Sequence, residues 1–90
     1  MKFALVSAAF LFTVTTNAAS PEIKVGSKAF TEGYLLGELA AQKIEELPEQ
    51  KVRREFGLGN TGIVVQALLS GKIDLYPEYT GTIAESILHD

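Results

Sequence analysis

Ile73-Asp-Leu-Tyr-Pro-Glu-Tyr-Thr-Gly-Thr82 is a short apolar segment that runs into a turn with two tyrosines, a glutamate and two threonines. Such a turn at the carboxyl end of a strand is where open α/β sheets hold their ligands. The stretch therefore predicts a strand at Ile73–Tyr76, followed by a candidate binding turn that reaches Thr82. Glu78 is expected to order this turn or to cap the helix after it.

Two further strands are predicted upstream of this stretch. Glu22-Ile-Lys-Val-Gly-Ser27 alternates apolar and polar residues, which indicates a strand at 22–27. Lys51-Val-Arg-Arg-Glu-Phe56 indicates a second strand. Because a central parallel strand is normally apolar, this charged strand is expected at the edge of the sheet.

Helices are predicted between and after the strands. The first begins with Thr31 as its N-cap and ends before Pro48, and its apolar face consists of Leu35, Leu36, Leu39, Ala40, Ile44 and Leu47. Asn60 or Thr61 caps the second helix, which stops at Gly71. A third helix starts near Gly81 and runs to Leu88.

This order of elements predicts an α/β fold, a βαβαβα unit with a parallel sheet, because short right-handed crossovers join parallel strands. If the second strand is at the edge, the first strand lies between it and the third. The loop at Ser27-Lys28 and the turn at Tyr76–Thr82 would then be neighbours.

The side chains of these two loops suit a small zwitterion. Lys28 precedes a helix N-terminus, and both its ammonium and the free helix amides favour an anion such as a carboxylate. Tyr76 and Tyr79 offer ring faces that can hold a quaternary ammonium by cation–π attraction. Thr80 and Thr82 add hydroxyls that suit a carboxylate. The alternative, a solvated Lys28 and tyrosines that only pack the turn, fits the residues equally well.

Composition excludes several kinds of site. The chain of 90 residues has 8 basic and 11 acidic side chains, without the basic stripe of a nucleic-acid binder. It has no cysteine, and its one histidine is His89. The acidic residues show no ligand-like spacing. We therefore expect no metal site, no cofactor, no catalytic residue and no nucleic-acid partner.

The N-terminus predicts export. Lys2, an apolar run from Phe3 to Val14, and a small-residue zone around Ala18-Ala19 are typical of a cleaved secretory signal peptide at residues 1–19. The apolar run is too short to span a bilayer, so no stable membrane insertion is expected. A cysteine-free exported chain suits the periplasm. Residues 20–90 leave about 70 residues, a marginal size for a single core, which suggests part of something larger.

Five motifs in one register carry a family resemblance: Val25-Gly-Ser-Lys-Ala-Phe-Thr-Glu32, Leu36-Gly-Glu-Leu39, Gly57-Leu-Gly-Asn-Thr61, Gln66-Ala-Leu-Leu-Ser-Gly71 and Asp74-Leu-Tyr-Pro-Glu-Tyr-Thr-Gly-Thr82. They closely resemble the start of the glycine betaine/choline/carnitine-type substrate-binding proteins of osmoprotectant ABC transporters. The resemblance implies the type II periplasmic-binding-protein fold, with residues 20–90 as an incomplete first lobe and permease subunits as partners. It also implies that Lys28 and Thr82 contact the ligand carboxylate and that Tyr79 forms a wall of an aromatic cage, with Tyr76 a weaker candidate.

Other interpretations remain open at this point. The same fold could bind another zwitterion such as an amino acid, or the chain could be a non-functional truncated product. Gly57-x-Gly59-x-x-Gly62 matches a dinucleotide fingerprint, but it follows a charged strand. Asp74 and Glu78 could form a catalytic acid–base pair, but they lie at opposite ends of the third predicted strand.

Overall fold

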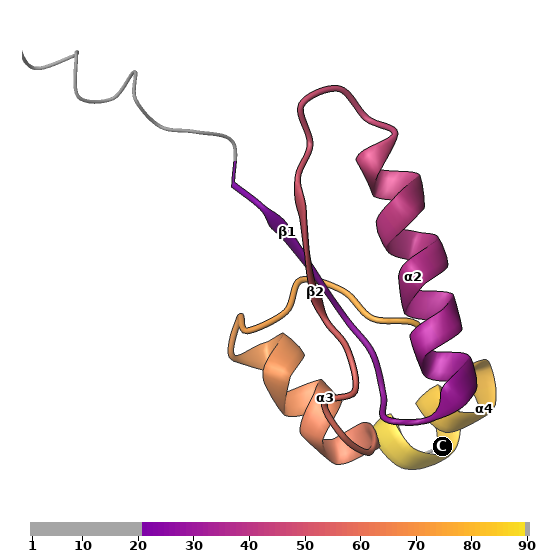
Figure 1. The fold of residues 1–90 in the computed structure, drawn as a ribbon. Helices are drawn as coiled ribbons and strands as arrows, with labels where there is room; N and C mark the ends of the chain where they lie inside the picture. The colour runs from indigo at the N-terminus through magenta and orange to yellow at the C-terminus, as the bar shows by residue number, and fades with distance from the viewer. Residues whose placement is uncertain (1–20, 90) are drawn as a thin grey trace, which may run out of the picture.

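Residues 21–89, the part of the chain that the computed structural model describes, form a small α/β unit (Figure 1). Its elements are β1 (Ile23–Gly26), α2 (Thr31–Glu45), β2 (Val52–Glu55), α3 (Thr61–Leu69), α4 (Thr80–Thr82) and a π-helical turn, η1 (Ile83–Ile87). In Figure 1, α2 and α3 lie on opposite sides of the two parallel strands. The predicted α/β fold is confirmed, whereas the signal peptide predicted at 1–19 lies outside the described residues.

Strand β1 lies between β2 and the residues of the third predicted strand. On one side it pairs with β2 in the register Ile23 to Val52. On the other side Val25 forms a parallel bridge with Leu75, and the N–H of Gly26 donates to the Leu75 carbonyl at 2.8 Å. The predicted strand order is therefore confirmed. The end of β1 lies beside the start of the Tyr76–Thr82 turn.

The third strand is shorter than the sequence predicted. Within Ile73–Tyr76 only the single bridge at Leu75 remains. One reason is that the Asp74 carboxylate, rather than a backbone carbonyl, accepts the N–H of Lys24 at 2.8 Å. A second reason is that Pro77 has no N–H to continue a ladder. The chain therefore leaves the sheet at once and enters the turn.

Small residues form the face of α2 that packs on the strands. Gly33, Gly37 and Ala41 are buried and lie four residues apart, which puts them on one side of the helix. A Cβ on Gly37 would lie 2.9 Å from the ring of Phe56, so helix and strand approach closely. The prediction of a leucine-rich core face is wrong for three exposed residues: Leu35, Leu39 and Leu47.

The two long helices begin differently. Phe30, with an extended backbone, is the N-cap of α2, and no side chain caps this helix. The prediction of Thr31 as the cap is wrong because the Phe30 carbonyl already accepts a helical bond from Tyr34, which leaves Thr31 one position inside the helix. In α3 the cap is as predicted, since the Asn60 side chain accepts the N–H of Ile63 at 3.1 Å.

A compact apolar contact joins α3 to the sheet. Val64 and Ala67 of α3 are buried with Ile73, and Leu58 and Tyr76 pack against them. This contact fixes the start of the candidate binding turn, Tyr76–Thr82, against α3. Within residues 21–89, no helix is both long enough and apolar enough to cross a membrane.

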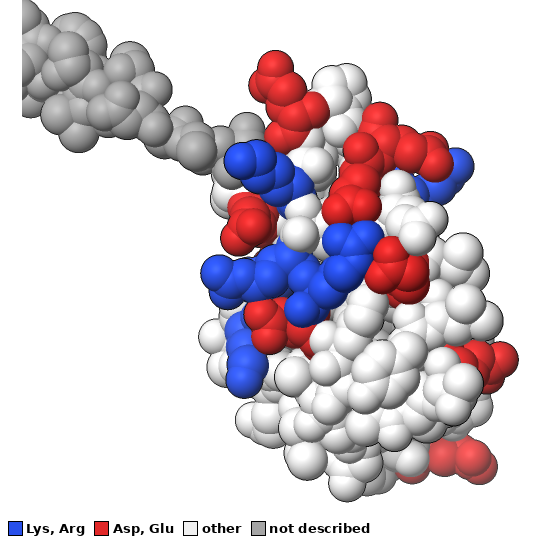
Figure 2. Space-filling model, viewed as in Figure 1, with Lys and Arg blue, Asp and Glu red and all other residues white. Residues whose placement is uncertain are grey.

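Charged side chains gather over the strands and the C-terminal half of α2 (Figure 2). Arg54, on the edge strand β2, donates to Glu38 at 2.8 Å and to Glu45 at 2.8 Å, both on α2. The hydrogen bonds from Arg54, and a weaker one from Gln42, lower the pKa of the Glu38 carboxyl to about 2. These ion pairs connect α2 to β2 at the surface.

We expect Glu38 to contribute to acid unfolding. Its carboxyl has a pKa near 4.5 in the unfolded chain and about 2 in the folded one, so between these pH values the unfolded state binds more protons. The contribution is complete above about pH 5 and is lost as the pH falls toward 2. In Glu38→Gln this part of the pH dependence should disappear, as measured by circular dichroism during acid titration. An acid profile identical to that of the parent would contradict the assignment.

Candidate functional site

A nearly buried ion pair connects the loop after β1 to the turn that follows Ile73–Tyr76, the third predicted strand. Lys28 Nζ lies 2.9 Å from Glu78 Oε1, and their side chains are only 12% and 6% exposed. The two residues are 50 positions apart in sequence. They meet because the Val25–Leu75 bridge brings the two strand ends side by side.

Glu78 organises the turn around this ion pair. Its Oε1 also accepts the backbone N–H of Tyr79 at 3.0 Å, and its Oε2 accepts the hydroxyl of Tyr76 at 2.9 Å. The expectation that Glu78 orders the turn is confirmed. Burial, together with the hydrogen bond and charge of Glu78, raises the pKa of Tyr76 to about 12. Tyr76 therefore remains a neutral hydrogen-bond donor at neutral pH.

An aromatic pair lies next to the ion pair. Tyr79 is half-exposed, and the centroid of its ring lies 6.4 Å from that of Phe30, with the planes tilted by 38°. The hydroxyl of Tyr79 donates to Glu32 in the first turn of α2. The site therefore presents aromatic rings from both strand ends. Sequence reasoning missed Phe30, although its position two residues after Lys28 in the same loop was a usable signal.

Backbone and hydroxyl contacts hold the loop after β1 against the loop before α3. The buried hydroxyl of Ser27 accepts the N–H of Gly57 at 2.9 Å. The N–H of Ala29 donates to the carbonyl of Gly59 at 3.0 Å. Together these contacts fix Lys28 relative to the start of α3.

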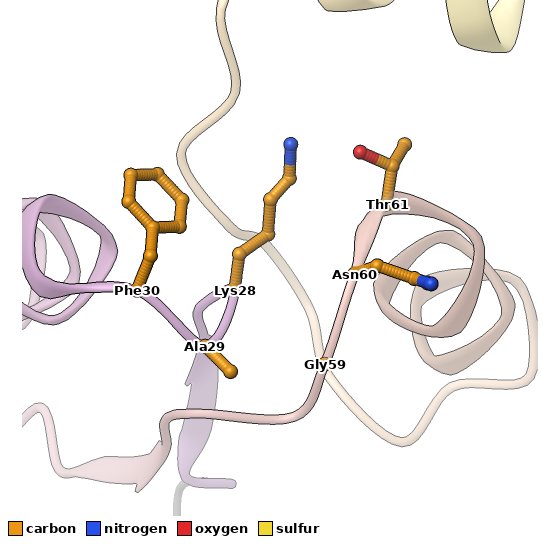
Figure 3. A pocket seen from close by; sticks show the side chains of 6 residues that line it. All are labelled: Lys28, Ala29, Phe30, Gly59, Asn60 and Thr61. Atoms are coloured by element: carbon orange, nitrogen blue, oxygen red, sulfur yellow. The ribbon is translucent and has the colours of Figure 1, made fainter.

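An open hollow of about 400 Å³ lies between these loops, and its lining residues are Lys28, Ala29, Phe30, Gly59, Asn60 and Thr61. Figure 3 shows the side chains of Lys28, Phe30 and Thr61 extending to the same side, with Lys28 between the other two. The N-terminus of α3 contributes Thr61, which sequence reasoning treated only as an alternative helix cap. The signal that could have identified Thr61 as a site residue was its position at the carboxyl edge of the sheet, next to the loop after β1.

The structure brings three of the four predicted site residues together. Lys28 and Tyr76 both bond to the Glu78 carboxylate, and Tyr79 bonds to it through its backbone. Thr82 lies within α4 and is half-buried. Among the hydrogen bonds of residues 21–89, none joins its hydroxyl to the other three residues.

The geometry gives the rival interpretations little support. The dinucleotide fingerprint at Gly57–Gly62 does lie between a strand, β2, and a helix, α3. However, Glu78, the acidic residue that would complete the fingerprint, follows Ile73–Tyr76, which lies on the opposite side of β1 from β2. Asp74 bonds to Lys24, while Glu78 bonds to Lys28, so the two carboxylates serve different partners. Residues 21–89 contain no cluster of three side chains that could hold a metal ion.

Residues 21–89 match the family described as the substrate binding domain of ABC-type glycine betaine transport systems. The chain belongs to this family. The predicted resemblance is thereby confirmed.

Two characterised relatives support this membership. The glycine betaine-binding protein YehZ of Escherichia coli (strain K12) is 50% identical over 64 residues, which cover 71% of this chain and 20% of that protein. The ergothioneine transport permease/ergothioneine binding protein EgtU of Helicobacter pylori (strain G27) is 37% identical over 82 residues, covering 87% of this chain and 14% of that protein. The chain thus spans a fifth or less of the length of these relatives.

Proposed function

We propose that this chain supplies the ligand-facing segment of a periplasmic substrate-binding component of an ABC transporter for quaternary ammonium osmoprotectants, such as glycine betaine, choline or carnitine. The segment binds its ligand and catalyses no reaction. Its partners are the ligand and the permease subunits, and the signal peptide at residues 1–19 directs it to the periplasm.

One observation carries the proposal: a single carboxylate, Glu78, holds both the Lys28 ammonium and the backbone of Tyr79. A cationic donor and the backbone of an aromatic residue are thereby held by the same carboxylate oxygen, Oε1 of Glu78. The Lys28 ammonium has two further N–H groups with which to bind a ligand carboxylate.

Aromatic rings suit the opposite end of the same ligand. A quaternary ammonium has no N–H to donate, so the available attraction is cation–π contact with a ring face. Tyr79 and Phe30 form two walls for this group in our proposal, and Thr82 adds a hydroxyl toward the carboxylate. Glycine betaine and ergothioneine, the ligands named for the two relatives, are both zwitterions with a methylated ammonium and a carboxylate.

Calorimetry on a chimera tests this proposal. Residues 21–89 replace the matching segment of the Escherichia coli relative, which supplies the rest of the domain. We expect the chimera to bind at least one of glycine betaine, choline and carnitine. It should bind proline more weakly, because the proline ammonium carries no methyl group and has two N–H groups that fit a hydrogen-bonding site better. Preference for proline would favour an amino-acid transporter, and a folded chimera that binds none of the four would refute the proposal.

A further inference from the structure

A negative charge lies against the ammonium that is proposed to bind the ligand carboxylate. Lys28 Nζ and Glu78 Oε1 are 2.9 Å apart, and both side chains are close to fully buried. Charge interactions are stronger in such a place than in water. The two charges offset each other, so this end of the site is nearly neutral before a ligand arrives.

Glu78 is held too firmly for a ligand to displace it. Besides Lys28, its carboxylate accepts the N–H of Tyr79 and the hydroxyl of Tyr76. Moving the carboxylate away would leave the part-buried Tyr76 hydroxyl without its partner, and an unsatisfied buried polar group is costly. The carboxylate therefore stays beside Lys28 while the ligand uses the remaining ammonium donors.

We propose that Glu78 is a specificity-determining residue whose charge lets the site accept quaternary ammonium cations without a carboxylate as well as zwitterions. The inference rests on the proposed function. Without the Glu78 charge, the Lys28 end of the site carries a net positive charge. Such an end attracts a ligand carboxylate more strongly and repels a ligand that is only a cation.

The test compares two probes that differ at this end alone. Glycine betaine carries a carboxylate where choline carries a hydroxymethyl group. In the chimera with Glu78→Gln, which keeps the side-chain shape, we expect the ratio of the choline Kd to the glycine betaine Kd to rise about tenfold or more. If Glu78 only stabilises the turn, both affinities fall together and the ratio stays constant, which overturns the proposal.

Two matched variants separate charge from shape. Glu78→Asp keeps the charge and shortens the side chain, so both affinities fall while the ratio stays close to that of the parent. Glu46→Gln removes an equal charge at the far end of α2, where Glu46 pairs with Lys43 on the surface. This variant leaves both Kd values unchanged. A ratio that moves equally in Glu78→Gln and Glu46→Gln contradicts a local role for Glu78.

A second background keeps the test decisive if Glu78→Gln alone does not fold. In Lys28→Met the site keeps only the negative charge, and adding Glu78→Gln removes the partner that was left unpaired. The second substitution must again raise the Kd ratio by about tenfold. A parent chimera that binds neither probe refutes the proposed function itself, whereas a parent that binds both with an unmoved ratio refutes only the role of Glu78.

Discussion

Substitution of Gly26 by alanine is expected to lower the free energy of unfolding by about 1–3 kcal/mol. A Cβ at this position would lie 2.6 Å from Cδ1 and 3.0 Å from Cγ2 of Ile73. Ile73 is 1% exposed and packs against Val64 and Ala67 of α3, so it has little room to move away. The added methyl group would force β1 and the segment Ile73–Tyr76 apart at the point where they position the candidate site.

Gly81→Ala is the matched control for this prediction. No heavy atom lies within 4 Å of a Cβ built on Gly81, which is in α4. The control should be neutral or stabilising by up to about 1 kcal/mol, because alanine restricts the unfolded chain and favours helix. Thermal unfolding of both variants of the chimera measures the difference. Equal unfolding midpoints for Gly26→Ala and Gly81→Ala would show that Ile73 moves to make room for the added methyl group, which would contradict the prediction.

The strand order and the meeting of the two loops could be predicted because they follow from composition. The charges of Arg53, Arg54 and Glu55 indicate an edge strand, and this placement leaves β1 beside the third segment. The ammonium of Lys28 and the aromatic ring of Tyr79 then identify the two loops as a candidate site.

Other features depend on geometry that the sequence does not encode locally. Helical periodicity showed that α2 has an apolar face, but the buried stripe consists of small residues. Phe56 fills the space above Gly37, and Gly33 lies against the backbone carbonyl of Lys28. Asp74 shortened the third strand by competing for a backbone N–H, which depends on the register with β1. The contact of Glu78 with Lys28 likewise requires the register of two segments that lie far apart in the chain.

Tyr79→Ala in the chimera is expected to weaken quaternary ammonium binding by about 1–2 kcal/mol, or about 5- to 30-fold in Kd. Tyr79 is 42% exposed and its ring lies beside that of Phe30, so part of the residue is accessible to a ligand. Removing it takes away the attraction that replaces hydrogen bonding for a fully methylated ammonium. Calorimetric titration with glycine betaine measures the loss.

Tyr79→Phe and Tyr34→Ala determine whether the ring face causes this loss. Phenylalanine keeps the face and removes only the hydroxyl that donates to Glu32, so affinity should stay within about threefold of the parent. Tyr34 is similarly exposed, at 47%, but its ring packs against Phe56 rather than against Phe30, so its removal should leave Kd unchanged. If Tyr79→Phe weakens binding as much as Tyr79→Ala does, the hydroxyl and not the ring holds the ligand. If Tyr79→Ala binds as tightly as the parent, Tyr79 does not belong to the site.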